Sequence, residues 1–293
     1  MARYLILSNI TIDAGGRSMI DGFTQGIQEF DSHAHIMCLY HPDFHKPGTY
    51  NYFREPDEYE AAFSWADCAI DLGGLFNRQP NRYEHMVWAQ KLNKPIVYGS
   101  QSFQTVDKAV LTAPRTKVVA RGQRAANKLT NAGIPVTAIA PDLSFLIKPE
   151  DVFISKKSLL YLTSKRIFST HFTKKYNLMY ELADPETDLQ IIEKLPNGEI
   201  VYEPEIPNIK HFSGTPAQHF GLVAQAEEIH TARYQIACAA ILAGKKPIIY
   251  GTGDDNYDSK YEDLMDLYGK SAKELRDGAL VSCELAAEAA NGG

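Results

Sequence analysis

The sequence predicts an α/β protein with two Rossmann-like domains and mostly parallel sheets. Apolar runs of strand length alternate with stretches of helical periodicity along most of the chain, which is the pattern of βαβ units. The alternation breaks near residues 149–157, and a length of 293 residues suits two domains of ordinary size. We therefore expect an N-terminal domain over residues 1–150 and a C-terminal domain over 151–293, whose last helix is a candidate to cross back to the first domain.

In the first domain, short apolar runs end in glycine or in turn-forming residues, as buried parallel strands do. The helical pattern is clearest where Met19, Ile20, Phe23 and Ile27 recur on one face. Residues 41–60 lack periodicity, and we expect a long loop there, which is uncommon unless it is functional. The expected elements are strands at 4–8, 36–40, 68–72, 94–99, 117–120 and 136–139, with helices beginning near 19 and at 83–92 and 123–132.

The second domain continues the alternation. Thr215 is a suitable N-cap and Pro216 a suitable first residue of a helix, and Gly244 suits the end of another. Residues 252–260 are acidic and polar, and we expect a loop. The expected elements are strands at 158–162, 199–202, 227–231 and 246–251, with helices at 170–182, from 216 onward, 233–243, 261–268 and 278–290.

Composition and charge exclude several classes of protein. Asp and Glu outnumber Lys and Arg by 36 to 30, and a net charge of −6 argues against coating nucleic acid through bulk charge. Hydrophobic residues make up 44% and charged residues 23%, which excludes disorder over most of the chain. No uncharged apolar run approaches the ~20 residues of a spanning helix, so we expect no membrane span.

The N-terminus and the cysteines indicate a cytoplasmic protein. The first seven residues carry one charge and a short apolar run without a cleavage site, so a first strand is a better interpretation than a signal peptide. Cys38, Cys68, Cys238 and Cys283 are far apart, form no CxxC and have apolar or small neighbours. We expect four free, buried thiols in a reducing compartment.

Open parallel sheets bind ligands beyond the carboxyl ends of their strands, so the residues that follow each strand are candidates for a site. Gly15 and Gly16, with Arg17, follow the first strand at the head of a helix, where backbone N–H groups can approach an anion. A tight turn that merely needs glycine is an equally good interpretation. The spacing is not GxGxxG, so no dinucleotide fingerprint is present.

Three further strand ends of the first domain carry candidate residues. Asp71 precedes Gly73 and Gly74, and glycines there allow close approach of a ligand or of a neighbouring helix. Arg121 directly follows a strand, where a solvated arginine at a helix start is the plainer interpretation. Asp142 also follows a strand and can orient a sugar hydroxyl, although a helix cap or a structural turn is slightly favoured.

The most informative stretch is 227–249, in which a strand leads into an apolar helix. Thr231, Arg233 and Gln235 lie at the N-terminus of that helix, where the dipole is positive and Arg233 adds a cation. Packing of an apolar helix does not require an arginine there, so a phosphate or carboxylate ligand is favoured over a capping arginine. Lys260 can serve a phosphate or simply start the next helix.

Histidines and aromatic residues give two weaker signals. An HxH at 33–35 with further histidines at 41 and 45 suggests a metal cluster, but no carboxylate is placed beside it, so we expect surface or packing histidines and no metal.

The loop at 41–60 contains Tyr52 and Arg54, which suit stacking on a sugar or a base. We expect this loop to border the cleft between the domains and to bind the acceptor.

Taken in order, these stretches resemble the polysaccharide pyruvyltransferase family, with a likeness that covers most of the chain. It is best at 9–22, 69–76, 118–145 and 226–268. The stretches similar to family motifs are Asn9 to Arg17, Asp71-Leu72-Gly73-Gly74, Val119-Ala120-Arg121-Gly122 with the later Leu129 and Gly133-Ile134, Pro141-Asp142-Leu143-Ser144-Phe145, Ala232-Arg233-Tyr234-Gln235-Ile236 with Gly244 and Pro247, and Lys260.

The resemblance implies two Rossmann-like domains in a glycosyltransferase-B-like arrangement. It also implies transfer of a pyruvyl or glycosyl group from a phosphorylated donor, phosphoenolpyruvate or a nucleotide sugar, to a hydroxyl of a sugar-like acceptor, without cofactor or metal. Family members have a histidine where this chain has Gln235, and glutamine forms hydrogen bonds but cannot act as a general acid. The implied site has Arg233 and Gln235 as catalytic residues, with Gly15, Gly16, Arg17, Gly73, Gly74, Arg121, His230, Thr231, Arg233 and Lys260 for the donor, and Tyr52, Arg54, Asp71 and Asn77 for the acceptor.

Two other functions stay open on the sequence. A nucleotide-sugar-dependent glycosyltransferase that acts on modified bases in phage DNA fits the same fold, although the negative net charge counts against a nucleic-acid acceptor. A sugar- or nucleotide-binding module that lost catalysis together with the histidine is the other. The basic cluster compatible with a DNA acceptor is Arg115, Lys117, Arg121, Arg124 and Lys128.

Overall fold

The computed structural model describes residues 1–7, 14–39, 56–72, 75–76, 80–150, 177–180, 200–203, 215–226, 228–251, 253 and 255–292. The chain forms two compact units: the first combines Met1–Leu146 with Lys273–Gly293, and the second is Ile147–Ala272. The long helix α11 (Ala272–Asn291) thus belongs with the N-terminal part of the chain. Each unit contains parallel strands and helices, as the alternating sequence pattern predicts.

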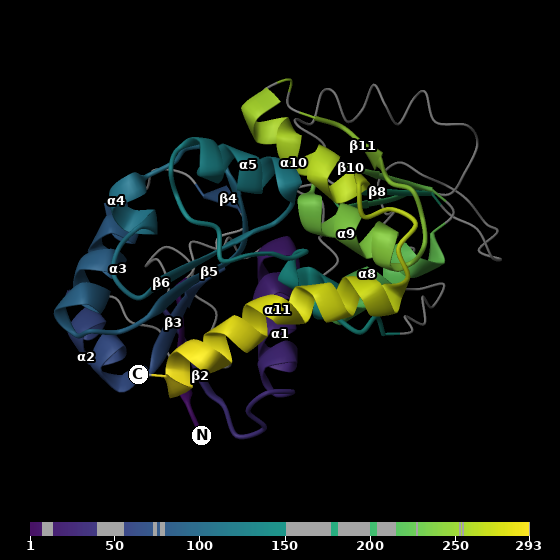
Figure 1. Ribbon diagram of the computed structural model, residues 1–293. Helices are drawn as coiled ribbons and strands as arrows, with labels where there is room; N and C mark the ends of the chain where they lie inside the picture. The colour runs from purple at the N-terminus through teal and green to yellow at the C-terminus, as the bar shows by residue number, and fades with distance from the viewer. Residues whose placement is uncertain are drawn as a thin grey trace. The chain divides into compact units, whose positions relative to one another are not determined.

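A parallel sheet forms the centre of the first unit (Figure 1). Its strands follow the order β2-β1-β3-β5-β6-β7, and β4 pairs with β5 outside this path. Every described strand pair is parallel, and parallel pairs need long connections that return the chain to the same edge of the sheet. The strands are β1 (Arg3–Leu7), β2 (His35–Leu39), β3 (Cys68–Asp71), β4 (Leu75–Phe76), β5 (Ile96–Phe103), β6 (Thr116–Ala120) and β7 (Ala138–Ile139).

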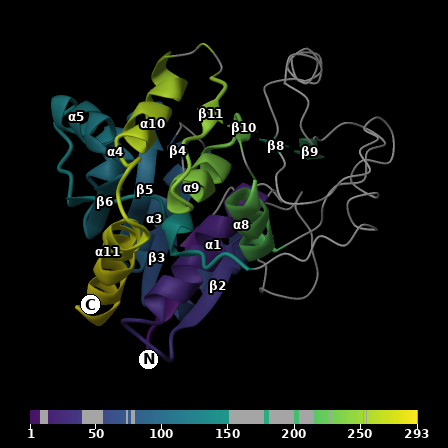
Figure 2. The same cartoon turned by 90° about the vertical axis from the view of Figure 1, so that its right-hand side faces the viewer.

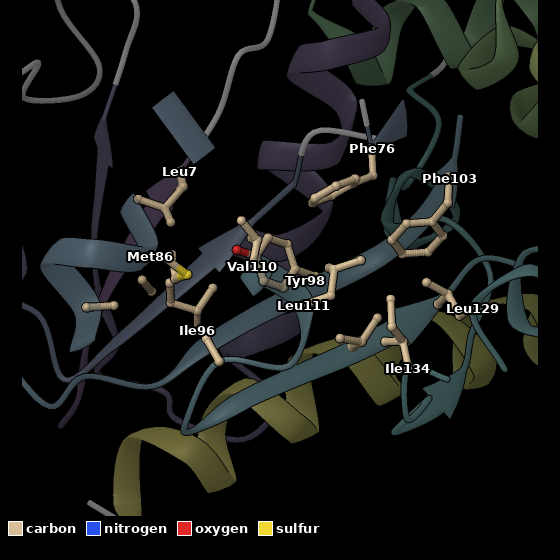
Figure 3. Packing of buried hydrophobic residues seen from close by; sticks show 14 of the residues in the cluster. Leu7, Phe76, Met86, Ile96, Tyr98, Phe103, Val110, Leu111, Leu129 and Ile134 are labelled. Carbon is tan, nitrogen blue, oxygen red and sulfur yellow. The ribbon is translucent and has the colours of Figure 1, made fainter. Parts of the chain in front are cut away.

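Apolar side chains join the helices of the first unit to its sheet. One buried cluster includes Tyr98, Phe103 and Leu129 together with residues of α2, α3 and α4 (Figure 3). Gly26 allows α1 and α11 to approach closely, because a Cβ at this position would lie only 2.8 Å from Cys283 Sγ. No described helix is long and apolar enough to cross a membrane. Besides α11, the helices are α1 (Ala14–Ile27), α2 (Pro56–Trp65), α3 (Pro80–Lys91), α4 (Lys108–Leu111), α5 (Gln123–Asn131) and the 3-10 helix η1 (Leu143–Leu146).

β5 is longer than the sequence predicts. The pattern predicts an end at Gly99, whereas the strand continues to Phe103. Its pairing with β6 shifts register between Tyr98 and Gln101. Ser100, within this irregularity, has a φ of 47°, in the left-handed region that residues other than glycine rarely adopt. The bulge resets which side chains face each side of the sheet beyond it.

The second unit has a parallel sheet in the order β11-β10-β8-β9 (Figure 2). Thr215 caps α8 as predicted, in a capping box with Gln218 and with proline in the first turn. Apolar residues of α8 and α9 pack with Ile229 in one buried cluster. The described elements are β8 (Asn177–Tyr180), β9 (Ile200–Glu203), α8 (Pro216–Gln225), β10 (Ile229–Thr231), α9 (Tyr234–Leu242), β11 (Ile248–Ile249) and α10 (Asp255–Met265).

Further elements differ from the sequence prediction. Residues 56–60 begin α2 rather than ending a loop, because Phe63 buries this helix in the core. Residues 177–180 form β8 where a helix is predicted, because pairing with strands on both sides outweighs the local pattern. α10 begins at Asp255, so Lys260 lies inside a helix and not at the end of a loop.

All four cysteines are buried thiols outside any disulfide, as predicted. Burial raises the pKa of the Cys68 thiol to about 12, and burial also raises the pKa of the Cys38 and Cys283 thiols. Because the thiolate is the reactive form, we expect the native protein to react very slowly with an aromatic disulfide reagent. Unfolding without reductant should expose all four thiols to the reagent, and a titration that finds fewer would contradict the free state.

Candidate functional site

The strand order of the first unit changes direction at β1. This strand lies between β2 and β3, and the chain then continues outward through β5, β6 and β7. Open parallel sheets bind ligands outside the carboxyl ends of their strands at such a switch point. Asp71 is the last residue of β3 and is 3% exposed. It therefore lies where this topology favours a ligand.

Gln101 holds Asp71 at the end of β3. β5 extends beyond β3, since Asp71 lies opposite Tyr98 in register. The Gln101 side chain, which is fully buried, donates from Nε2 to the Asp71 main-chain oxygen at 2.8 Å and to Asp71 Oδ1 at 2.9 Å. Gln101 is not among the residues predicted from the sequence, although three consecutive polar residues at 100–102 in an otherwise apolar strand are a usable signal.

Arg121 and Asp142 form a buried ion pair in the first unit. Arg121 Nη2 lies 3.0 Å from Asp142 Oδ2 without the alignment of a hydrogen bond, and both side chains are almost completely buried. Arg121 Nε donates to the Ser100 main-chain oxygen at 3.0 Å, and Asp142 Oδ1 accepts from Ser144 N at 2.8 Å. The surface interpretation of Arg121 is therefore wrong, whereas the structural turn predicted at Asp142 is confirmed.

In the second unit, a short turn joins β10 to α9. Thr231 Oγ1 accepts a hydrogen bond from Arg233 N at 2.8 Å, and the Tyr261 hydroxyl of α10 donates to the Ala232 main-chain oxygen. Arg233 is the N-cap residue of α9, with extended backbone and no side-chain capping bond. Its side chain and that of Gln235 are partly exposed. The turn is thus held by hydrogen bonds that join its main-chain atoms to the side chains of Thr231 and Tyr261.

The electrostatics of this turn suit an anion. The N-terminus of α9 carries the positive end of the helix dipole, and the Arg233 guanidinium adds a fixed charge. Lys260 is 6% exposed, and its Nζ lies 4.9 Å from the ring centroid of Tyr261, whose hydroxyl anchors the turn. Of the predicted donor residues, Thr231 and Arg233 therefore lie in the turn. Lys260 lies beside Tyr261, whose hydroxyl holds the turn.

His230 has partners of its own in β10. Its Nδ1 lies 2.9 Å from the Tyr250 hydroxyl and its Nε2 3.5 Å from Glu228 Oε2, and its ring stacks on that of Tyr250. Burial, and secondarily the charge of Glu228, raises the pKa of Tyr250. Alternation along a strand directs His230 and Thr231 to opposite faces, so His230 does not share the face of the residue that holds the turn.

Several predicted residues have no described side-chain environment. Arg17 is partly exposed in the first turns of α1, and only the backbone of Gly15 and Gly16 is described there. In the described part of the chain, no group of three or more His, Cys, Asp or Glu side chains could hold a metal ion. The predicted site residues that lie outside the described residues are Tyr52, Arg54, Gly73, Gly74 and Asn77.

Solved structures similar to this chain share its fold at low sequence identity. The UDP-GlcNAc 2-epimerase of Neisseria meningitidis bound to UDP-GlcNAc has a TM-score of 0.56 at 10% identity, over 97% of this chain and 99% of the other. S. aureus MnaA with UDP has a TM-score of 0.54 at 10% identity, over 97% of this chain and 94% of the other. These likenesses confirm the α/β Rossmann-like fold class. No curated protein sequence matches the chain.

The sequence also matches a family model over most of its length. The model describes the polysaccharide pyruvyl transferase family and matches residues 24–254. This range includes Asp71 and Gln101 at the switch point of the first unit and Arg233 at the N-terminus of α9. The chain therefore belongs to the polysaccharide pyruvyl transferase family and is a sugar-modifying transferase.

Proposed function

We propose that the protein transfers a pyruvyl or glycosyl group from a phosphorylated donor to a hydroxyl of a sugar-like acceptor. The observation that carries the proposal is the turn before α9, where Arg233 occupies the N-cap position at the positive end of the helix dipole. A helix N-terminus with a neighbouring arginine suits a phosphate, because aligned N–H groups and a guanidinium fork both donate to its oxygens.

Catalysis at this turn would be electrostatic. Arg233 and the dipole of α9 would stabilise the charge that develops on the departing phosphate, and they are held in place before the reaction begins. Gln235, the second residue of α9, can donate a hydrogen bond to the donor or accept one from it, but it cannot transfer a proton. Proton transfer, where the reaction needs it, would therefore fall to another group or to solvent.

The family membership favours phosphoenolpyruvate as the donor. A nucleotide sugar is the second candidate, since glutamine replaces the histidine implied by the family resemblance and a departing nucleoside diphosphate needs charge stabilisation more than a proton. The structural relatives named above are complexes with UDP-GlcNAc or UDP, which makes uridine nucleotides the natural comparison. No cofactor is part of either reaction as proposed.

A DNA acceptor is less well supported than a sugar. The Arg121 side chain is buried against Asp142, Lys117 Nζ lies 3.0 Å from Glu288 Oε2, and Lys128 Nζ donates to a main-chain oxygen at 2.9 Å. These three members of the basic cluster therefore have protein partners, which reduces the positive charge available to a phosphate backbone.

A thermal-shift screen tests the proposed donor. Phosphoenolpyruvate and UDP sugars should be added singly to the protein, with inorganic phosphate and uridine as controls. A true donor at 100 times its dissociation constant stabilises the native state by about 2.7 kcal/mol, which gives a clear rise in Tm. If no phosphorylated donor raises Tm beyond the effect of inorganic phosphate, the proposal loses its support.

A further inference from the structure

We propose that Tyr261 of α10 is a positioning residue for donor binding, because it fixes the direction in which the Arg233 side chain leaves the turn before α9. The inference rests on the proposed function, since it takes Arg233 as the residue that binds the donor. The contacts that carry it lie within the second unit. They join α10 to a single peptide group of the turn.

The peptide group between Ala232 and Arg233 is held at both of its polar atoms. Its oxygen, on Ala232, accepts a hydrogen bond from the Tyr261 hydroxyl. Its N–H, on Arg233, donates to Thr231 Oγ1 at 2.8 Å. Because a peptide group is planar, the two contacts restrict the dihedral angles on either side of it, which are ψ of Ala232 and φ of Arg233. The Cα–Cβ bond of Arg233 therefore leaves the turn in a defined direction.

The two partners of this peptide group come from different parts of the chain. Thr231 is the last residue of β10 and lies two residues before Arg233. Tyr261 is 29 residues from Ala232 along the chain and belongs to α10. The threonine orders the turn locally, whereas the tyrosine ties it to a second element. Without the tyrosine, the turn could move as a whole relative to α10.

Tyr261 is itself well placed to hold the turn still. Its side chain is 6% exposed, and its ring centroid lies 6.0 Å from that of Tyr234, the first residue of α9. α10 is joined to the segment after β11 by Asp258, whose Oδ2 accepts a hydrogen bond from Gly253 N at 2.9 Å. The hydroxyl is thus fixed before a donor arrives, which lowers the cost of ordering the site on binding.

The same ring also lies beside the other predicted donor cation of this unit. Lys260 Nζ lies 4.9 Å from the Tyr261 ring centroid, within the ~6 Å of a cation–π contact. The hydroxyl of that ring bonds to the peptide group before Arg233. Tyr261→Phe therefore separates the two contacts, because it retains the ring beneath Lys260 and removes only the bond to the turn.

Donor affinity of Tyr261→Phe tests the positioning role. The dissociation constant of phosphoenolpyruvate, or of the UDP sugar that binds, should rise about threefold to tenfold in calorimetric titration, the worth of one hydrogen bond. Tyr250→Phe is the matched control in the same unit. It also removes a hydroxyl, but one that lies 2.9 Å from His230 Nδ1 and not at the turn, and it should leave the donor dissociation constant unchanged.

A double variant shows whether the tyrosine acts through the arginine. In the Arg233→Ala background, Tyr261→Phe should weaken donor binding no further, because no guanidinium remains to be positioned. A tyrosine that only stabilises the fold would lower Tm and leave the donor dissociation constant unchanged. Equal dissociation constants for Tyr261→Phe and wild type, or additive losses in the double variant, would overturn the inference.

Hydrogen exchange of the Arg233 amide tests the same contact without any donor. Loss of the Tyr261 hydroxyl should speed this exchange roughly fivefold, as expected for one hydrogen bond of local stability, and NMR measures the rate. An unchanged rate would overturn the inference. Failure of the wild type to bind phosphoenolpyruvate or any UDP sugar would instead contradict the proposed function, and the exchange rate would still decide whether Tyr261 fixes the turn.

Discussion

Arg233→Ala should weaken binding of the phosphorylated donor by roughly tenfold to a hundredfold, the equivalent of a charge-assisted contact of ~1.5–3 kcal/mol. The fold should stay intact, because the turn is held by hydrogen bonds that join its main-chain atoms to the side chains of Thr231 and Tyr261. Calorimetric titration with phosphoenolpyruvate and with UDP sugars, together with a melting curve of the variant, measures both effects.

Two further variants separate a specific contact from bulk charge. Arg233→Lys should recover little affinity if the guanidinium holds the phosphate with two parallel hydrogen bonds. Lys246→Ala removes an exposed cation from the same unit and should leave donor affinity within about twofold, as expected for a screened surface charge. A lowered Tm with normal donor affinity in Arg233→Ala would show that the arginine is structural.

Arg121→Met should destabilise the protein by about 3–5 kcal/mol, because it leaves the Asp142 carboxylate buried without its cation. For a unit of this size, such a loss lowers Tm by roughly 10 °C. The effect should be nearly as large for Asp142→Asn, which retains an oxygen to accept the Ser144 N–H but removes the negative charge that Arg121 faces. Differential scanning calorimetry of the single variants measures the loss.

The double variant Arg121→Met/Asp142→Asn should regain most of the lost stability, because it removes both buried charges. Lys117→Met breaks an ion pair in which the Glu288 side chain is 58% exposed, and it should cost less than about 1 kcal/mol. Similar losses for Arg121→Met and Lys117→Met would contradict the claim that burial makes the Arg121 pair important.

The parts of the fold that local patterns determine could be predicted from the sequence. Buried parallel strands are apolar on both faces and are seen as short apolar runs, as at β3, where all four residues are buried. The start of α8 could be predicted because Thr215 caps the helix and Pro216 begins it, and both effects depend only on nearby residues. β8 could not be predicted, because its conformation depends on pairing with β9 and β10, which are distant in the sequence.

The candidate site also has one part that could be predicted from the sequence and others that could not. The turn at Arg233 could be predicted because a strand end and a helix start meet within a few residues. The burial of Arg121 could not, since Asp142 and the bulge at Ser100 are each about twenty residues away along the chain. Gln101 was missed because a glutamine gains meaning only once Asp71 is known to lie beside it.

Transfer itself is the most direct test of the account. Phosphoenolpyruvate and, separately, UDP sugars should be incubated with the protein and a mixture of the methyl glycosides of glucose, galactose and mannose. The products should be followed by ³¹P NMR and mass spectrometry. The account predicts that inorganic phosphate or UDP accumulates only when the acceptor is present, and that the glycoside gains a pyruvyl or glycosyl group. Saturable binding of a donor without any acceptor-dependent transfer would contradict it and would indicate a sugar- or nucleotide-binding module without catalysis.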